Sequence, residues 1–79
     1  MPNQRLRNVS LADYRLFLSK AGCKKIRTNG GHEVWAKAGC TRPIVVQSHE
    51  SPVPEFIIKN GLRTLGLSKQ DFFDILFGN

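Results

Sequence analysis

The chain has 79 residues, 41% of them hydrophobic, and its 12 lysines and arginines outnumber its 6 acidic residues to give a formal charge of +6. This length suits one small domain, and no apolar run approaches the roughly 20 residues of a membrane span or resembles a secretory signal. We therefore expect a single cytoplasmic domain over residues 1–79 that does not cross a membrane, with residues 1–9 flexible or loosely held.

The positive charge is concentrated in the first part of the chain. Residues 1–47 carry nine basic and two acidic side chains, a balance of +7, whereas residues 48–79 carry three basic and four acidic ones. A positive field favours a polyanion, because each Lys or Arg that contacts a phosphate also releases condensed counterions. Nucleic acid is the natural partner. A charged surface that only keeps the protein in solution is the alternative.

The first predicted element is a helix that begins after Ser10. Ser10 and Asp13 have the S-x-x-D spacing of a capping box. The apolar residues that follow recur at helical spacing on one stripe: Leu11, Tyr14, Phe17, Leu18 and Ala21. Gly22 lies near the expected C-cap.

Three short strands are predicted next. Residues 23–28 alternate Ile26 with charged neighbours and lead into the glycine-rich turn 29–31, which favours a hairpin with a second strand over residues 32–37. After a turn at residues 38–41, residues 43–47 supply a third strand that is rich in β-branched side chains. Together they predict a three-stranded antiparallel meander.

A second helix is predicted after the proline-bearing loop 48–54. Pro54 lies near its start, Gly66 ends it, and its apolar residues fall at i, i+4 and i+7: Ile58, Leu62 and Leu65. Gly61 weakens this helix by up to about 1 kcal/mol relative to alanine, unless close packing against a neighbour requires the missing side chain.

A short terminal helix completes the chain. Ser68 and Asp71 repeat the capping-box spacing, and the apolar residues that follow lie on more than one face. Phe73 and Phe77 therefore pack on the core or meet a partner. The predicted order is α-β-β-β-α-α, an α+β fold with the helices on one face of the sheet.

Few residues are available for catalysis. The sequence has no phosphate-binding glycine loop, no HExxH motif and no nucleophile elbow, and the acidic residues from Glu50 to Asp74 are too scattered for a two-metal nuclease. Cys23 and Cys40 lack the spacing of a zinc site and are expected to be reduced thiols without a role. We expect no metal and no cofactor, which leaves histidine and cations.

Histidine and cations suffice for RNA cleavage, because RNA carries its own nucleophile in the 2′-hydroxyl. An imidazole takes the 2′-hydroxyl proton or protonates the departing 5′-oxygen, and Lys or Arg stabilises charge on the phosphoryl oxygens. Gly30 and Gly31 have no Cβ and would let a phosphate approach the backbone beside His32. From the residues alone, a structural histidine at the start of a strand remains the alternative.

Over roughly residues 10–76 the chain resembles the HicA family of bacterial toxins. The resemblance rests on a histidine after a basic strand and a glycine turn, a β-rich middle that ends near a histidine, and a C-terminal pattern of Gly66-Leu67-Ser68, Phe72 and Leu76. It implies a fold like that of a double-stranded-RNA-binding domain. It also implies a metal-independent endoribonuclease, an mRNA interferase, which a HicB antitoxin silences in a hetero-oligomeric complex.

The resemblance also implies which residues form the site. The family's Gly-Ser-His motif matches Gly30-Gly31-His32, so His32 takes the position of the catalytic histidine and Gly31 replaces a serine, which lowers activity or leaves the backbone N–H to orient the phosphate. His49 follows the third strand and is given a minor role. Residues expected to contact RNA are Lys24, Lys25, Arg27, Gly30 and Gly31, and then, as second choices, Lys37 and Arg42.

Several alternatives stay open. The charged strand could be a solvated face, and Trp35 is expected to pack in the sheet or core rather than to stack on a base. The chain could be a non-catalytic module that binds double-stranded RNA. A DNA-binding accessory protein is the third possibility, and the sequence has no clear helix-turn-helix to support it. An antitoxin would cover His32 and the basic strand with acidic side chains.

Overall fold

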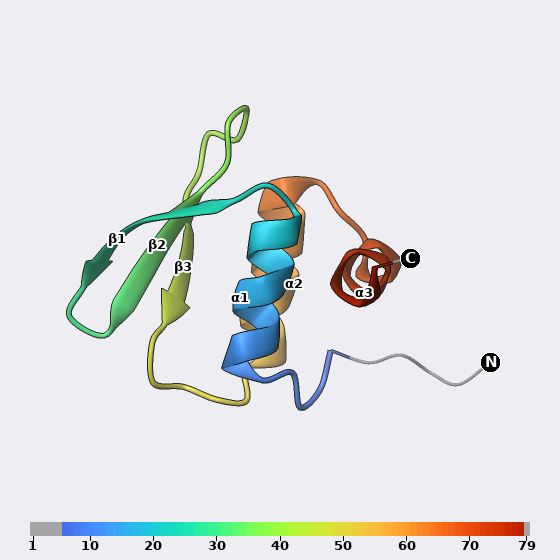
Figure 1. Cartoon of the computed structure of the whole chain (residues 1–79), viewed down its shortest axis with the longest axis horizontal. Coiled ribbons are helices and arrows are strands. Elements are labelled where there is room, and N and C mark those ends of the chain that lie inside the picture. The colour runs from blue at the N-terminus through green and yellow to red at the C-terminus, as the bar shows by residue number, and fades with distance from the viewer. Residues whose placement is uncertain (1–5, 79) are drawn as a thin grey trace.

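The order of helices and strands is the predicted one. A computed structural model describes residues 6–78 and has the elements α1 (Leu11–Lys20), β1 (Lys24–Asn29), β2 (His32–Ala36), β3 (Ile44–Gln47), α2 (Glu55–Leu65) and α3 (Lys69–Phe77) (Figure 1). The α+β class and the order α-β-β-β-α-α are confirmed. In the part of the chain that the structure describes, no helix combines the length and the apolar character that a membrane span requires.

The three strands form an antiparallel meander in the order β1-β2-β3. Asn29 faces His32 where β1 turns into β2, and His32 in turn faces Gln47 of β3. A β-bulge between Lys25 and Arg27 places one extra residue in β1. β1 and β3 are therefore the two edges of the sheet, and β2 lies between them.

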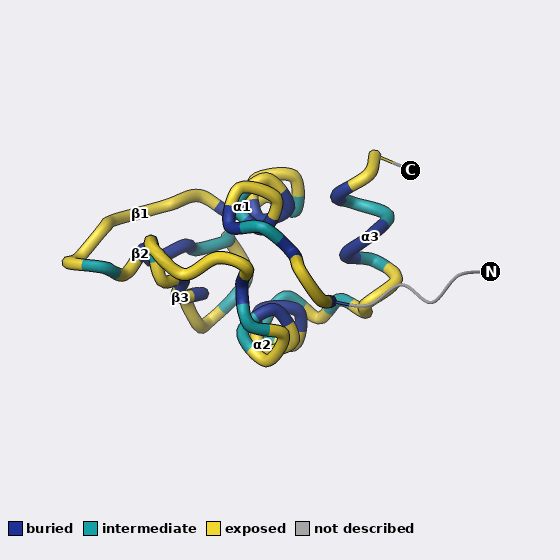
Figure 2. Tube along the Cα trace, turned by 90° about the horizontal axis from the view of Figure 1, so that it is seen from below, coloured by how far each residue is buried: buried dark blue, intermediate teal, exposed yellow. Residues whose placement is uncertain are grey.

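The two faces of the sheet have different environments. Trp35, Ile44 and Val46 belong to the hydrophobic core and face α1 and α2. Side chains alternate along a strand, so His32 and Val34 lie on the opposite face. Val34 is buried but does not belong to the core cluster, which agrees with this placement. We call this second side the open face, because none of the helices that the structure describes covers it (Figures 1 and 2).

The helices form two further layers rather than one. α1 and α2 lie against the sheet, whereas α3 packs on these two helices on the side away from the sheet (Figure 1). The contact uses aromatic rings, with the centroids of Phe17 and Phe72 4.6 Å apart. The Lys20 ammonium donates to the Leu76 carbonyl at 3.0 Å. The expectation that the helices cover one sheet face thus holds for α1 and α2, and α3 covers them in turn.

The helix ends follow the predicted capping residues. The Ser10 hydroxyl accepts a hydrogen bond from the Asp13 N–H at 3.0 Å. Ser68 and Asp71 form both bonds of a capping box, which fixes the first turn of α3. Gly66 ends α2 with a φ of 72°, a left-handed conformation that glycine adopts without steric cost.

Gly61 in α2 is required by close packing. A Cβ at this position would collide with the hydroxyl of Tyr14, which is wholly buried on α1. The ring is held in the core and cannot move aside easily. Tyr14 is therefore the close neighbour that requires a residue without a side chain at position 61.

The segment before α1 is more ordered than expected. Leu6 and Val9 are 1% and 7% exposed and belong to the core, and the Val53 N–H donates to the Val9 carbonyl at 2.8 Å. The expectation of a loosely held segment over residues 1–9 is thus wrong for residues 6–9, because these two apolar side chains fill space in a small core. Residues 1–5 lie outside the described residues.

Candidate functional site

The turn between β1 and β2 presents His32 to solvent. Gly30 has a φ of 62°, which lets the two strands reverse direction within the short turn. His32 begins β2, is exposed, and lies on the open face between Asn29 and Gln47. The predicted catalytic residue is therefore accessible to a ligand as large as an RNA strand.

A second histidine lies at the same turn. The Ser48 N–H donates to the Gly31 carbonyl at 2.7 Å and so extends the β2–β3 pairing by one step. This brings the next residue, His49, over Gly31: its Cε1 lies 2.5 Å, and its Nδ1 3.1 Å, from the position that a Cβ on residue 31 would take. The imidazole of His49 therefore occupies the space that a side chain at position 31 would need.

The two glycines of the turn consequently differ in what they offer. Among residues 6–78, apart from Gly30 and its two chain neighbours, no heavy atom lies within 4 Å of a Cβ built on Gly30, so a phosphate has room to approach there. At Gly31 the corresponding space is filled by His49, which corrects the expectation that both glycines leave the backbone open. The sequence gives His49 only a minor role, because it lies in the loop after the third strand. The pairing of residues 32 and 47 was the signal that could have located it.

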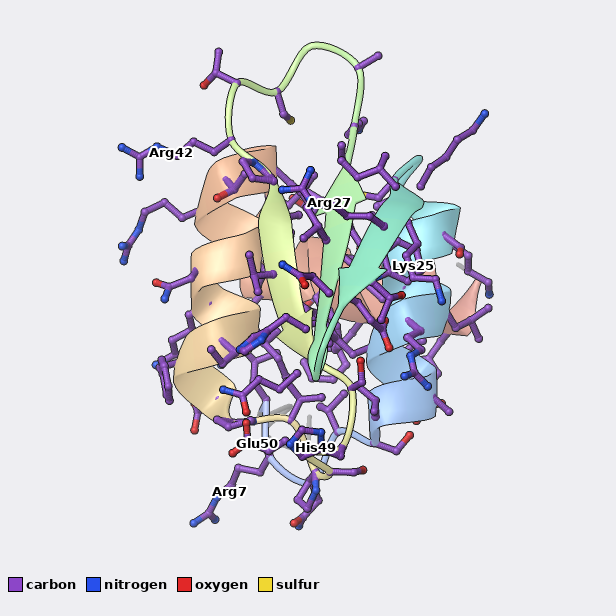
Figure 3. The ribbon with its side chains drawn as sticks, turned by 90° about the vertical axis from the view of Figure 1, so that its left-hand side faces the viewer. Arg7, Lys25, Arg27, Arg42, His49 and Glu50 are labelled. Carbon is purple, nitrogen blue, oxygen red and sulfur yellow. The ribbon has the colours of Figure 1, made fainter. Side chains whose placement is uncertain are left out.

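The predicted RNA-contacting residues of β1 form a row of exposed cations. Lys24, Lys25 and Arg27 are exposed, as is the whole of β1 (Figure 2). None of the three forms an ion pair within residues 6–78, where the salt bridges are Arg15–Glu33 and Lys59–Glu55. Arg27 is the closest of the three to His32 along the strand, two positions before Asn29. It lies in front of the sheet, and Lys25 lies to its side (Figure 3).

Lys37 is not brought to this turn. It follows the far end of β2, about 16 Å from His32 at the usual rise of a strand. Its aliphatic stem packs over Gly22, with Cε 3.4 Å from the position of a Cβ there. Lys37 therefore belongs to the opposite end of the sheet, and only a ligand that runs along the strands would contact both residues.

Glu33, which reasoning from the sequence counted only as a charge, lies in a buried network. Its carboxylate accepts hydrogen bonds from Arg15 Nε at 3.1 and 3.2 Å and from Trp35 Nε1 at 3.1 Å, and Arg15 Nη2 also pairs with it. The bonds from Arg15 are the main cause that lowers the pKa of Glu33 to about 2. Strand alternation places Glu33 on the same side of β2 as Trp35, and this pattern in the sequence could have revealed that Glu33 faces the helices.

This placement makes the open face basic. Because Glu33 faces the helices, β2 contributes no carboxylate to the surface that carries His32 and Arg27. Trp35 is 6% exposed and lies in the core, so the prediction that it packs rather than stacks on a base is confirmed. The open face thus offers imidazole and guanidinium groups without a competing acid from β2.

The cysteines and acidic residues do not form a metal site in the described part of the chain. No group of three or more His, Cys, Asp or Glu side chains among those residues lies close enough to hold an ion. Cys23 and Cys40 are free thiols, as expected. Burial raises the pKa of the Cys23 thiol, and the Cys40 thiol donates to the Thr64 carbonyl at 3.7 Å.

Comparison with known proteins gives no match for this chain among protein-family models, curated proteins or solved structures.

Proposed function

We propose that this protein is a HicA-like toxin, an endoribonuclease that cleaves mRNA without a metal and uses His32 to transfer a proton. In this proposal the fold is of the double-stranded-RNA-binding type, and the protein acts in the cytoplasm. The observation that supports it most directly is the position of His32, which is exposed at the end of a sheet face that carries cations and no carboxylate from β2.

The proposed reaction needs few protein groups. His32 accepts the proton of a 2′-hydroxyl, whose oxygen attacks the adjacent phosphorus. The bond from phosphorus to the 5′-oxygen breaks, the 5′-oxygen takes up a proton, and a 2′,3′-cyclic phosphate and a 5′-hydroxyl remain. Arg27 stabilises the charge on the non-bridging oxygens. His49 is the second imidazole at the turn and the nearest candidate to supply the proton to the leaving oxygen.

A HicB-like antitoxin is the proposed protein partner. A surface that covers the turn and β1 would exclude RNA phosphates and block His32 at the same time. Acidic side chains suit such a surface, because Lys24, Lys25 and Arg27 have no ion-pair partners within residues 6–78.

The test is cleavage of RNA by the wild type and by His32→Ala. We expect the wild type to yield fragments with 2′,3′-cyclic phosphate ends, with or without EDTA, and the variant to lose at least a hundredfold in rate, the usual effect of removing a general base. His32 is exposed, so circular dichroism and RNA affinity should stay near the wild-type values. Undiminished cleavage by the variant contradicts the role of His32, and loss of activity in EDTA contradicts the metal-independent reaction.

A non-catalytic RNA-binding module is the second candidate. The row of cations on β1 favours it, because such a row binds a phosphate backbone whether or not a reaction follows. This candidate predicts RNA affinity without cleavage products at any protein concentration, and free expression in the absence of an antitoxin.

A further inference from the structure

A hollow at the end of the sheet opposite His32 has the composition of a phosphate site. It has a volume of about 300 Å³ and is lined by Thr41, Arg42, Arg63 and Thr64. Two of these residues come from the β2–β3 loop and two from the end of α2. The Cys40 thiol donates to the Thr64 carbonyl at 3.7 Å and so ties the loop to the helix. The hollow therefore lies between a loop and a helix end that are in contact with each other.

The charges in the hollow are unbalanced. Arg42 and Arg63 are exposed, neither forms an ion pair in the described part of the chain, and no acidic residue lines the hollow. Two guanidinium groups at one small site repel each other unless an anion lies between them. Arg63 lies in the last turn of α2, where the helix dipole favours a cation without any ligand. Arg42 lies in a loop, so the helix dipole does not account for a cation at that position.

The donors match a phosphate group. Guanidinium groups bind phosphate oxygens with two parallel N–H bonds, and threonine hydroxyls are common additional donors to nucleic-acid phosphates. A hollow with two of each offers donors from two sides. Such a set of donors suits a phosphate mono- or diester.

The distance from the hollow to His32 indicates which phosphate of an RNA strand would reach the hollow. β3 runs from the hollow to Gln47, which faces His32, so the hollow and His32 are about 15 Å apart at the usual rise of a strand. Figure 3 shows Arg27 in front of the sheet, above His49 and to the right of Arg42. At about 3.4 Å per nucleotide, the rise of one strand in a stacked duplex, this span corresponds to about four nucleotides.

From this arrangement we infer that the Arg42–Arg63 hollow binds a backbone phosphate of the RNA substrate, about four nucleotides from the bond that is cleaved at His32. The inference rests on the proposed function and adds to it a second contact that sets a minimum substrate length. The strand would run across the open face, past Arg27, from the β1–β2 turn to the hollow.

The experiment compares RNA of two lengths in the His32→Ala background, where the substrate stays intact. Fluorescence anisotropy gives the affinity for a single-stranded 12-mer and for a dinucleotide, with and without Arg42→Gln and Arg63→Gln together. We expect the double change to weaken 12-mer binding about tenfold and to lower the salt slope of log K by about 0.7, the value for one phosphate contact on a single strand. Dinucleotide binding should not change.

The matched control is Lys59→Gln with Lys69→Gln, which removes the same charge from exposed positions outside the hollow. It should leave the 12-mer affinity within about twofold. Equal losses for both RNA lengths, equal losses in the control, or an unchanged 12-mer affinity each overturn the inference. Saturation of the hollow by inorganic phosphate without displacement of the 12-mer also overturns the inference. The same holds if Arg42→Gln and Arg63→Gln together weaken only the binding of the antitoxin. Cleavage by the wild type and its loss in His32→Ala test the proposed function separately.

Discussion

At the scale of single residues, the contact between Tyr14 and Gly61 leaves the Tyr14 hydroxyl without a hydrogen bond within residues 6–78 and requires glycine at position 61. The Tyr14 hydroxyl is buried and has no hydrogen-bond partner within residues 6–78, and burial is the main cause that raises the pKa of Tyr14. An unpaired buried hydroxyl costs about 1–3 kcal/mol. The same hydroxyl fills the space beside Gly61 and so excludes every larger residue there.

A double-mutant cycle tests this contact. Gly61→Ala alone should destabilise the protein by about 1–3 kcal/mol, because the collision with the hydroxyl outweighs the gain of about 1 kcal/mol in helix propensity. Tyr14→Phe alone should be neutral or stabilising. In the Tyr14→Phe background the nearest ring atom is 3.6 Å from the new Cβ, an ordinary contact, so Gly61→Ala should then be neutral or stabilising. Urea denaturation measures all four proteins, and equal effects of Gly61→Ala in both backgrounds would refute the collision.

At the scale of the elements, the Arg15–Glu33 pair joins α1 to β2. The Glu33 side chain is 3% exposed and that of Arg15 is 39% exposed. Solvent therefore screens the charge of Arg15 but hardly reaches that of Glu33. Because the pKa of Glu33 is lowered to about 2 in the folded protein, the carboxylate is favoured by folding. Its contribution is fully present above the pKa of the unfolded chain, 4.5, and is lost as the pH falls towards 2.

Glu33→Gln should therefore lower the free energy of unfolding at pH 7 by about 2 kcal/mol, a value reduced from the full shift because Arg15 reaches solvent. It should also flatten the decline of stability between pH 4.5 and 2. Thermal melts at pH 7 and between pH 4.5 and 2 measure both effects. Glu55→Gln, which breaks an exposed pair with Lys59, is the control and should change stability by less than about 0.5 kcal/mol. A variant with the wild-type pH profile would show that the pair contributes nothing to acid stability.

The third layer, α3, gives Phe73 and Phe77 different environments, which helical spacing in the sequence did not distinguish. Phe73 is 8% exposed and packs in the core, whereas Phe77 is 64% exposed and stacks on Phe73 with centroids 6.0 Å apart. The sequence predicted that these residues pack on the core or meet a partner. The position of α3 against α1 decides that Phe73 is a core residue and leaves Phe77 at the surface.

At the scale of the whole molecule, the uneven charge has a direct consequence for the proposed antitoxin. The cations of β1 lie along one edge of the sheet, and steering by such a row depends on salt. Reversing Lys24 and Lys25 to glutamate should slow association with an acidic antitoxin at least tenfold at low salt and much less at 0.5 M salt. Stopped-flow fluorescence measures the rates, with Lys69→Glu as the control at a distant site. An association rate that neither salt nor these reversals alters would place the contact elsewhere, for example at Phe77.

The sequence by itself determined the order of the elements, the hairpin, the helix caps and the basic character of β1, because these depend on spacing, turn residues and composition within a few positions. It also identified His32 as a candidate at the start of a strand, and the structure shows that this side chain is exposed. Only the tertiary structure decided that His49 covers Gly31, that Glu33 faces inward to Arg15, that Leu6 and Val9 belong to the core, and that Arg42 and Arg63 share a hollow. Each of these results joins residues far apart in the chain, and such contacts follow from strand register and helix packing, which periodicity along the sequence does not specify.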